Sequence, residues 1–155
     1  MRKLFQGSLI IFLSGLVLIF LSCTPLSCIG ETESYVKASL YDKVLKKLHS
    51  PDSLTMYGLN METSKLYDKT LNVQPAHIPL NASATYCTYI IRIDGLTDTL
   101  KFWYNSYPHL ISKECGYTYY HTLDSLTFTN HLIDTVLIRN KRVTTINEEN
   151  IRIFY

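Results

Sequence analysis

The sequence predicts an all-β fold: an antiparallel β-sandwich of the immunoglobulin-like or Greek-key type, with an open β-barrel as the alternative. Runs rich in β-branched and aromatic residues recur about every ten to fifteen residues after the N-terminal segment. Several runs alternate apolar and polar side chains, the two-residue period of a half-buried strand. The 155 residues contain no internal repeat and no low-complexity linker, so we expect residues 35–155 to form one domain.

The N-terminal part of this domain contains three expected strands and two segments that need comment. The expected strands are residues 34–41, 53–59 and 76–80. The last of these contains Pro79, which lacks a backbone donor and places the strand at a sheet edge. The apolar spacing in 42–52 predicts two helical turns that end at Pro51, or else a loop. The run 64–72 is ambiguous.

The central and C-terminal parts have clearer signals. The turn Asp94-Gly95 predicts a β-hairpin between the runs that flank it. The run that ends at Tyr155 is so apolar that we expect it to be paired inside a sheet, and the basic run 139–142 is expected to form a polar hairpin tip. The expected strands here are residues 84–93, 98–105, 115–123, 126–131, 133–139 and 150–155.

The N-terminus predicts an export signal. A basic start is followed by an apolar run at 8–21, about 14 residues long, whereas a spanning helix needs roughly 20. Ser22 directly precedes Cys23, and the two resemble a bacterial lipobox. We therefore expect 1–22 to be a lipoprotein signal peptide, Cys23 to carry the lipid and 23–34 to be a tether. A membrane-spanning anchor, ordinary secretion and lipidation at Cys28 are the alternatives.

The expected cleavage leaves a chain without net charge. It removes Arg2 and Lys3, so 13 of the 15 basic residues remain beside 13 acidic ones. Nucleic-acid binding depends on clustered Lys and Arg, and the mature chain has only one short basic run. We therefore expect no nucleic-acid partner.

Three cysteines remain besides Cys23, and at most one internal disulfide can form among them. Cys87 shares a strand face with apolar residues, which indicates core filling. Cys28 and Cys115 both lie at segment edges near a glycine, and we expect them to be paired. Three free thiols are the alternative.

The sequence contains no catalytic, metal or cofactor motif. A nucleophile elbow, a glycine-rich phosphate loop and a His-Glu-x-x-His motif are all missing, and the histidines are scattered. We therefore expect no enzyme activity, no metal and no cofactor. A hydrolase would require a cleft in which a histidine and a carboxylate converge.

Two patterns are compatible with sugar chemistry. Trp103, Tyr104 and Tyr107 could form a flat platform for a glycan, although aromatic residues more often pack within a sheet. An Asp-(Ser/Thr)-aliphatic pattern resembles the O-glycosylation acceptor motif of Bacteroides-type bacteria. Its candidate acceptors are Ser53, Thr99, Ser125 and Thr135. The alternative is a turn aspartate at the start of a strand.

Several segments resemble a family of small Bacteroidales lipoproteins that is known only as a domain of unknown function. The segments are "CIGETESYVKASLYD", "YIIRIDGLTDTLKFWY", "ISKECGYTYYHTL", "IDTVLI" and "NIRIFY". The most specific pieces are the Cys-Gly-Tyr at 115–117 and the terminal Ile-x-Ile-Phe-Tyr. The resemblance implies a β-rich fold, an envelope location and a pairing of Cys28 with Cys115, and it implies no activity.

These observations together predict a lipid-anchored cell-envelope protein that serves as a non-catalytic binding or structural accessory. Its expected place is the outer membrane, facing the periplasm, because no acidic signal for surface export directly follows Cys23. The expected partners are the membrane, through the lipid, and an unknown envelope protein or glycan. A glycan-binding module is the second hypothesis and an envelope hydrolase is the third.

Overall fold

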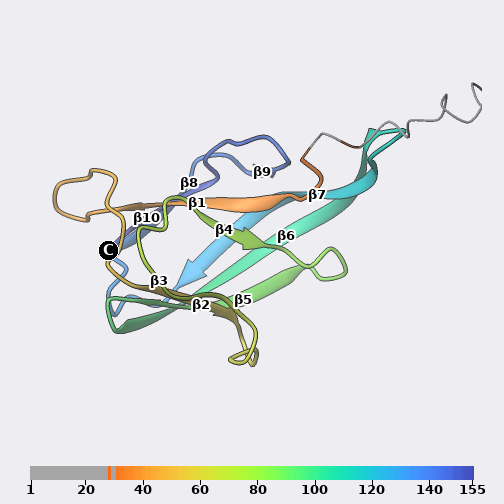
Figure 1. Cartoon of the computed structure of the whole chain (residues 1–155). Coiled ribbons are helices and arrows are strands. Elements are labelled where there is room, and N and C mark those ends of the chain that lie inside the picture. The colour runs from red at the N-terminus through yellow and green to blue at the C-terminus, as the bar shows by residue number, and fades with distance from the viewer. Residues whose placement is uncertain (1–27, 29–30) are drawn as a thin grey trace, which may run out of the picture.

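The computed structural model of the chain describes residues 28 and 31–155 (Figure 1). The described residues form strands and no helix, which confirms the all-β prediction. The predicted signal peptide 1–22 and the predicted lipidation site Cys23 lie outside the described residues. The strands are β1 (Tyr35–Tyr41), β2 (Leu54–Gly58), β3 (Lys65–Thr70), β4 (Ala76–Pro79), β5 (Tyr86–Ile93), β6 (Leu96–Ser112), β7 (Gly116–Phe128), β8 (Thr135–Ile138), β9 (Arg142–Val143) and β10 (Ile151–Phe154).

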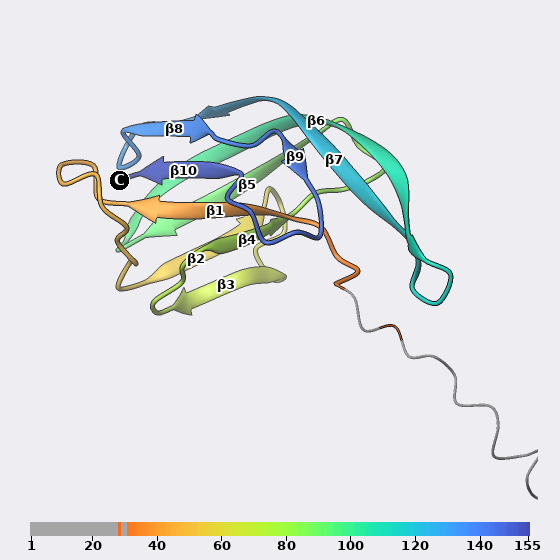
Figure 2. The ribbon, with the colours of Figure 1, turned by 90° about the horizontal axis from the view of Figure 1, so that it is seen from above.

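The strands form two sheets. The smaller sheet has the order β4-β1-β10-β8, and the larger has the order β3-β2-β5-β6-β7-β9. Figure 2 shows that β6 and β7 are the longest strands and that the larger sheet curls around one side of the smaller sheet. Strand β4 lies at a sheet edge, as Pro79 predicted.

The two ends of the domain meet in the smaller sheet. Strand β10 lies between β1 and β8, so the C-terminal run is paired on both sides as expected. Its pairing with β1 is parallel, with Ala38 opposite Ile151 and Leu40 opposite Ile153. The sequence did not predict this parallel pair, because alternation fixes which face a residue occupies but not the direction of its neighbour.

The core lies between the two sheets and follows the predicted alternation. One face of each central strand is closed to solvent. The most buried of these side chains, all at most 1% exposed, include Val36, Leu40, Leu54, Met56, Ile91, Ile93, Leu100, Phe102, Leu123, Ile151 and Ile153. Burial of one such side chain contributes about 1.5–3 kcal/mol, so this layer is the main source of stability.

Segment 42–52 is a loop, so the predicted helical turns are wrong and the loop alternative is confirmed. The carboxylate of Asp42 accepts hydrogen bonds from the amides of Val44 and Leu45 at 2.7 and 2.6 Å, which closes a turn. The apolar side chains of this loop face solvent, with Val44 78% and Leu48 60% exposed. A short helix is stable mainly when its apolar face packs against the rest of the protein. This loop projects from one end of the domain (Figures 1 and 2), so it has no such surface to pack against.

The predicted hairpin at Asp94-Gly95 is present, and its second strand is longer than expected. Asp94 and Gly95 have φ of 49° and 92°, the positive values that a tight hairpin turn requires. Strand β6 continues past the predicted end at 105 to Ser112. The pairing of β6 with β5 ends at Trp103, opposite Tyr86. Beyond Trp103, one side of β6 is a free sheet edge, where the missing backbone donor of Pro108 is tolerated. The predicted strands 115–123 and 126–131 are one strand, β7.

The basic run 139–142 is not a hairpin tip. It crosses from β8 in the smaller sheet to β9 in the larger one. The following loop is fastened to β1 by the buried Asn150, whose amide group donates to the carbonyl of Arg142 at 2.8 Å and accepts from the amide of Lys37 at 2.9 Å. The Lys37 ammonium donates to the carbonyl of Ile146 at 2.8 Å. These contacts fix the loop that borders the candidate site.

Candidate functional site

An aromatic cluster on the β6–β7 hairpin forms one wall of a cleft. The rings of His109 and Tyr120 stack with centroids 4.1 Å apart and an interplanar angle of 16°. Tyr107 meets Tyr120 edge-on at 6.2 Å and is 40% exposed. The Tyr120 hydroxyl is 3.1 Å from the Thr145 hydroxyl. The three rings therefore form a partly exposed aromatic surface, in which Tyr120 is fixed by its hydrogen bond to Thr145.

The strand register explains why these rings gather. Tyr107 is directly opposite Tyr120, and Ser106 is directly opposite His121. Successive side chains on a strand point to opposite faces. His121 is buried toward the core at 2% exposure, so Tyr107 and Tyr120 point outward, and His109, two residues after Tyr107, points outward with them.

The other wall of the cleft is mainly polar and comes from the segment that follows β8. It contributes Asn140, Arg142, Thr144 and Glu148 together with the apolar Ile146, and the cleft has a volume of about 370 Å³. The pairing of Thr122 with Arg142 brings this segment beside β7. The Asn140 amide donates to the Glu148 carboxylate at 2.7 Å, which orders both side chains.

This arrangement fits a polar ligand that has a flat apolar face. The volume lies within the range of small-molecule sites. A guanidinium, an amide and a carboxylate offer both donors and acceptors, while the aromatic rings offer an apolar wall. A sugar ring combines a C–H face with hydroxyl groups and matches both walls.

The predicted platform of Trp103, Tyr104 and Tyr107 does not form a single surface. Tyr104 is 1% exposed, and its hydroxyl is bonded to the backbone of Asn81 at 2.9 and 3.0 Å, so it belongs to the core. Trp103 is half-buried beneath the Lys101 ammonium at 4.6 Å. Only Tyr107 lies in the cleft.

Asp98 is the most deeply held carboxylate in the described part of the chain, and it has a structural role. It is 2% exposed. It accepts hydrogen bonds from the Thr129 hydroxyl at 2.6 Å and from the His131 ring at 3.0 Å. It also accepts from the backbone amides of His131, Leu132 and Ile133 at 2.8–2.9 Å. Burial alone would raise the pKa of Asp98, but these bonds outweigh it and lower the pKa to about 2. A carboxylate so occupied has no free lone pair for catalysis.

The structure brings one serine and one histidine together that the sequence did not pair. The Ser106 hydroxyl is 2.8 Å from Nδ1 of His121. Burial lowers the pKa of His121, and the ring packs edge-on against Tyr104 at 5.5 Å. Within residues 31–155 no carboxylate is hydrogen-bonded to this histidine, so the third group of a catalytic triad is missing. His121 also lines a shallow hollow together with Glu33 and Tyr119.

His109 and Glu148 line the same cleft without acting as a pair. The ring of His109 is stacked on Tyr120, and the carboxylate of Glu148 is engaged by Asn140. Over the described part of the chain, no hydrogen bond joins them. Each of the two side chains is therefore held by a different neighbour in the cleft.

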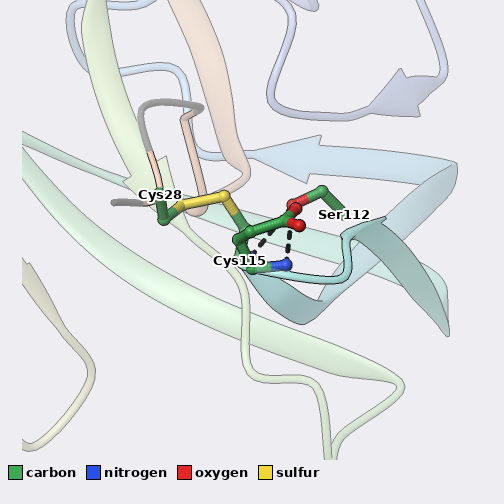
Figure 3. Close-up of a disulfide and its surroundings, with 4 residues drawn as sticks. Cys28, Ser112 and Cys115 are labelled. Atoms are coloured by element: carbon green, nitrogen blue, oxygen red, sulfur yellow. Dashed lines mark hydrogen bonds between the residues drawn. A yellow bond between two sulfur atoms is a disulfide. The ribbon is translucent and has the colours of Figure 1, made fainter. Parts of the chain in front are cut away.

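The predicted disulfide is present between Cys28 and Cys115 (Figure 3), with 4.9 Å between their Cα atoms. The Ser112 hydroxyl accepts from the backbone amides of Cys115 at 3.0 Å and Glu114 at 3.2 Å, and this closes the β6–β7 turn. Gly116 follows with φ of 73°, a conformation that favours glycine. Cys87 is free, packs against the core and has its pKa raised to about 11 by burial.

The candidate glycosylation acceptors differ in exposure. Ser125 is exposed, while Ser53, Thr99 and Thr135 are half-buried. All four remain predictions. The described residues contain no group of three potential metal ligands and no helix that is long and apolar enough to cross a membrane.

The structure defines an all-β domain of two sheets, with a cleft lined by aromatic and polar side chains beside a disulfide-closed hairpin. The chain belongs to a family of unknown function, DUF6452, whose model matches residues 53–155. The match includes the Cys-Gly-Tyr at 115–117 and the Ile-x-Ile-Phe-Tyr ending. Comparison with curated proteins and with solved structures found no match.

Apart from Tyr107, the residues of the cleft were not predicted from sequence: His109, Tyr120, Asn140, Arg142, Thr144, Ile146 and Glu148. The aromatic members carried a usable signal, because Tyr107 and His109 are two residues apart and share a strand face. The polar members carried none, since β9 is two residues long and its pairing with β7 is visible only in three dimensions.

Proposed function

We propose that this protein is a lipid-anchored protein of the cell envelope, held in the outer membrane and facing the periplasm, where it acts as a non-catalytic binding or structural accessory. The Cys28–Cys115 disulfide is the observation that carries the proposal. Such bonds form and persist in oxidising compartments and are rare in the cytosol. The signal-like segment and Cys23 supply the route and the anchor.

Mass spectrometry of the intact protein, purified from membranes, tests this proposal. We expect a mass that begins at an acylated Cys23, with two thiols that become alkylatable only after reduction. Cys87 supplies an internal control, because it should react with an alkylating agent in unfolded protein without any reductant. An unprocessed N-terminus would contradict the anchor, and three thiols without reductant would contradict the disulfide.

Glycan binding is the second candidate, and the cleft between Tyr107, Tyr120 and Arg142 favours it. One wall offers a stacked aromatic surface and the other offers ordered hydrogen-bonding groups. Protein sites for small ligands combine an apolar lining with a few fixed polar groups. This candidate concerns what the anchored domain holds, and it leaves the anchoring proposal unchanged.

Calorimetric titration with a panel of soluble chito-oligosaccharides, mannans and peptidoglycan fragments tests glycan binding. Tyr107→Ala and Arg142→Ala should each abolish binding of whichever probe the unmodified protein holds. Tyr86→Ala is the matched control, because Tyr86 is an exposed tyrosine, at 55%, and packs against Lys101 outside the cleft. No binding of any probe, or equal losses in all three variants, would count against this candidate.

A further inference from the structure

We propose that the turn end of the β6–β7 hairpin rests on the lipid bilayer and so fixes the orientation of the domain. The contact surface, called here the tip surface, comprises Leu110, Tyr117 and Tyr119. This inference rests on the proposed lipidation of Cys23. It goes beyond that proposal, because a lipid anchor alone leaves the domain free to turn in any direction.

The tip surface consists of exposed side chains that are mainly apolar. Tyr117 is 74% exposed, Tyr119 is 50% and Leu110 is 47%. Leu110 is directly opposite Tyr117 in the hairpin, and Tyr119 lies two residues further along the same strand. The three side chains therefore share one face. Here β6 and β7 have run past the core, so the second sheet does not cover them. The neighbouring segment is 32–35, which lines a shallow hollow together with Tyr119.

The disulfide brings this surface close to the anchor. Cys28 is joined to Cys115 in the hairpin turn (Figure 3), and Tyr117 is two residues further on. Cys23 precedes Cys28 by five positions, so their Cα atoms are at most about 18 Å apart. Without the bridge, the first contact of this segment with the domain would be Ser34, whose hydroxyl donates to the Tyr119 carbonyl. Ser34 is eleven positions from Cys23, so the reach would be about 40 Å. The bridge therefore confines the turn to the neighbourhood of the membrane surface.

The chemistry of the tip surface suits the boundary between lipid and water. Tyrosine has an apolar ring and a polar tip, and it is enriched at membrane interfaces. The exposed turn residues Lys113 and Glu114 carry opposite charges, and the exposed Glu33 lies beside Tyr119, so attraction to anionic headgroups does not drive the contact. We therefore expect the contact to depend on apolar burial and to persist when salt is added.

The molecule provides its own control surface. Val44, Leu45 and Leu48 are at least 60% exposed, and their loop lies at the end of the domain opposite the β6–β7 turn (Figures 1 and 2). If exposed apolar side chains alone determined which surface touches the membrane, this loop would bind the bilayer as well as the tip surface does. If the Cys28–Cys115 bridge determines the orientation, the loop faces away from the bilayer.

Fluorescence quenching by brominated phospholipids tests the proposal. The full-length lipidated chain carries Trp103→Phe, which removes the only tryptophan, and then either Tyr117→Trp or Leu45→Trp. Each protein is reconstituted into phosphatidylethanolamine–phosphatidylglycerol vesicles, and its acylation is verified by intact mass. We expect a blue-shifted, quenched emission from the Tyr117→Trp protein and unquenched emission from the Leu45→Trp protein, at low and at high salt.

The outcomes separate this proposal from the one it rests on. Acylated protein in which Tyr117→Trp is unquenched, or in which both probes are quenched alike, overturns the orientation and leaves the anchor intact. Protein that is never acylated overturns both. A further variant adds Cys28→Ser and Cys115→Ser to the Tyr117→Trp protein. Loss of quenching there, with the acyl chain still present, supports the bridge as the orienting element, and retained quenching counts against it.

Discussion

The two halves of the β6–β7 hairpin are held in place by different means. In the half near β5, Leu100, Phe102 and Leu123 are completely buried between the sheets. In the half near the turn, Leu110 and Tyr117 are largely exposed, although the strands continue in register. That half is fixed by ring stacking and by the disulfide.

The comparison shows that a regular strand and a hydrophobic core are separable. In the core half, the removal of apolar area from water stabilises the strands. In the turn half, cross-strand pairs contribute roughly 0.2–1 kcal/mol each, and the covalent link restricts the unfolded chain. The turn half therefore keeps its apolar side chains available for contacts outside the domain.

The largest effect is expected from a cavity in the core half. Phe102→Ala should lower the free energy of unfolding by about 3–5 kcal/mol, because Phe102 is fully buried between the sheets. Urea denaturation followed by circular dichroism measures this loss. A cost near that of an exposed residue would show that the core half is not the stabilising half.

Removal of the disulfide should have the next largest effect. The double variant Cys28→Ser, Cys115→Ser should lose about 2–4 kcal/mol, because the bridge closes a long loop in the unfolded chain. Hydrogen exchange should accelerate most near the turn of β6 and β7. Cys87→Ala is the matched control, since it removes a thiol without opening the bridge. Uniform acceleration along both strands would contradict the division of the hairpin.

The core half should also depend on pH through Asp98. The folded state lowers the pKa of Asp98 to about 2, below the unfolded value of roughly 3.9. The stabilisation is therefore present above pH 4 and is lost as the pH falls through about 2, for a total of about 2–3 kcal/mol. Unfolding measured across this range should show a smaller decline for Asp98→Asn than for the exposed control Asp124→Asn.

The smallest effect is expected at the turn. Tyr117→Ala should change the free energy of unfolding by less than about 0.5 kcal/mol, because Tyr117 is 74% exposed. Thermal unfolding of the domain in solution measures it. A loss above 1 kcal/mol would mean that the turn half has packing that its exposure does not reveal.

Much of the fold was predictable because alternation and turn chemistry act locally. The strand at 34–41, the edge position of Pro79 and the Asp94-Gly95 hairpin all follow from residues a few positions apart. The parallel pairing of β1 with β10 and the crossing from β8 to β9 depend on contacts between distant parts of the chain. No local pattern encodes those contacts.

The candidate site was predicted less well for the same reason. Tyr107 was identified as an exposed aromatic, but Tyr104, three residues earlier, is a core residue. A bulge between Trp103 and Tyr104 interrupts the regular alternation there. Arg142 joins the cleft only because β9 pairs with β7. By contrast, the disulfide was predictable, because few pairings are open to three cysteines.

The position of the bridge also decides where a mechanical load enters the domain. A pull on the chain ahead of Cys28 passes through the sulfur atoms into the β6–β7 turn. A pull on the turn along the hairpin axis moves both strands in the same direction, so their mutual hydrogen bonds are not peeled apart. The load falls instead on the β5–β6 ladder in shear, with many bonds sharing the force. The N-terminal end of β1 is spared.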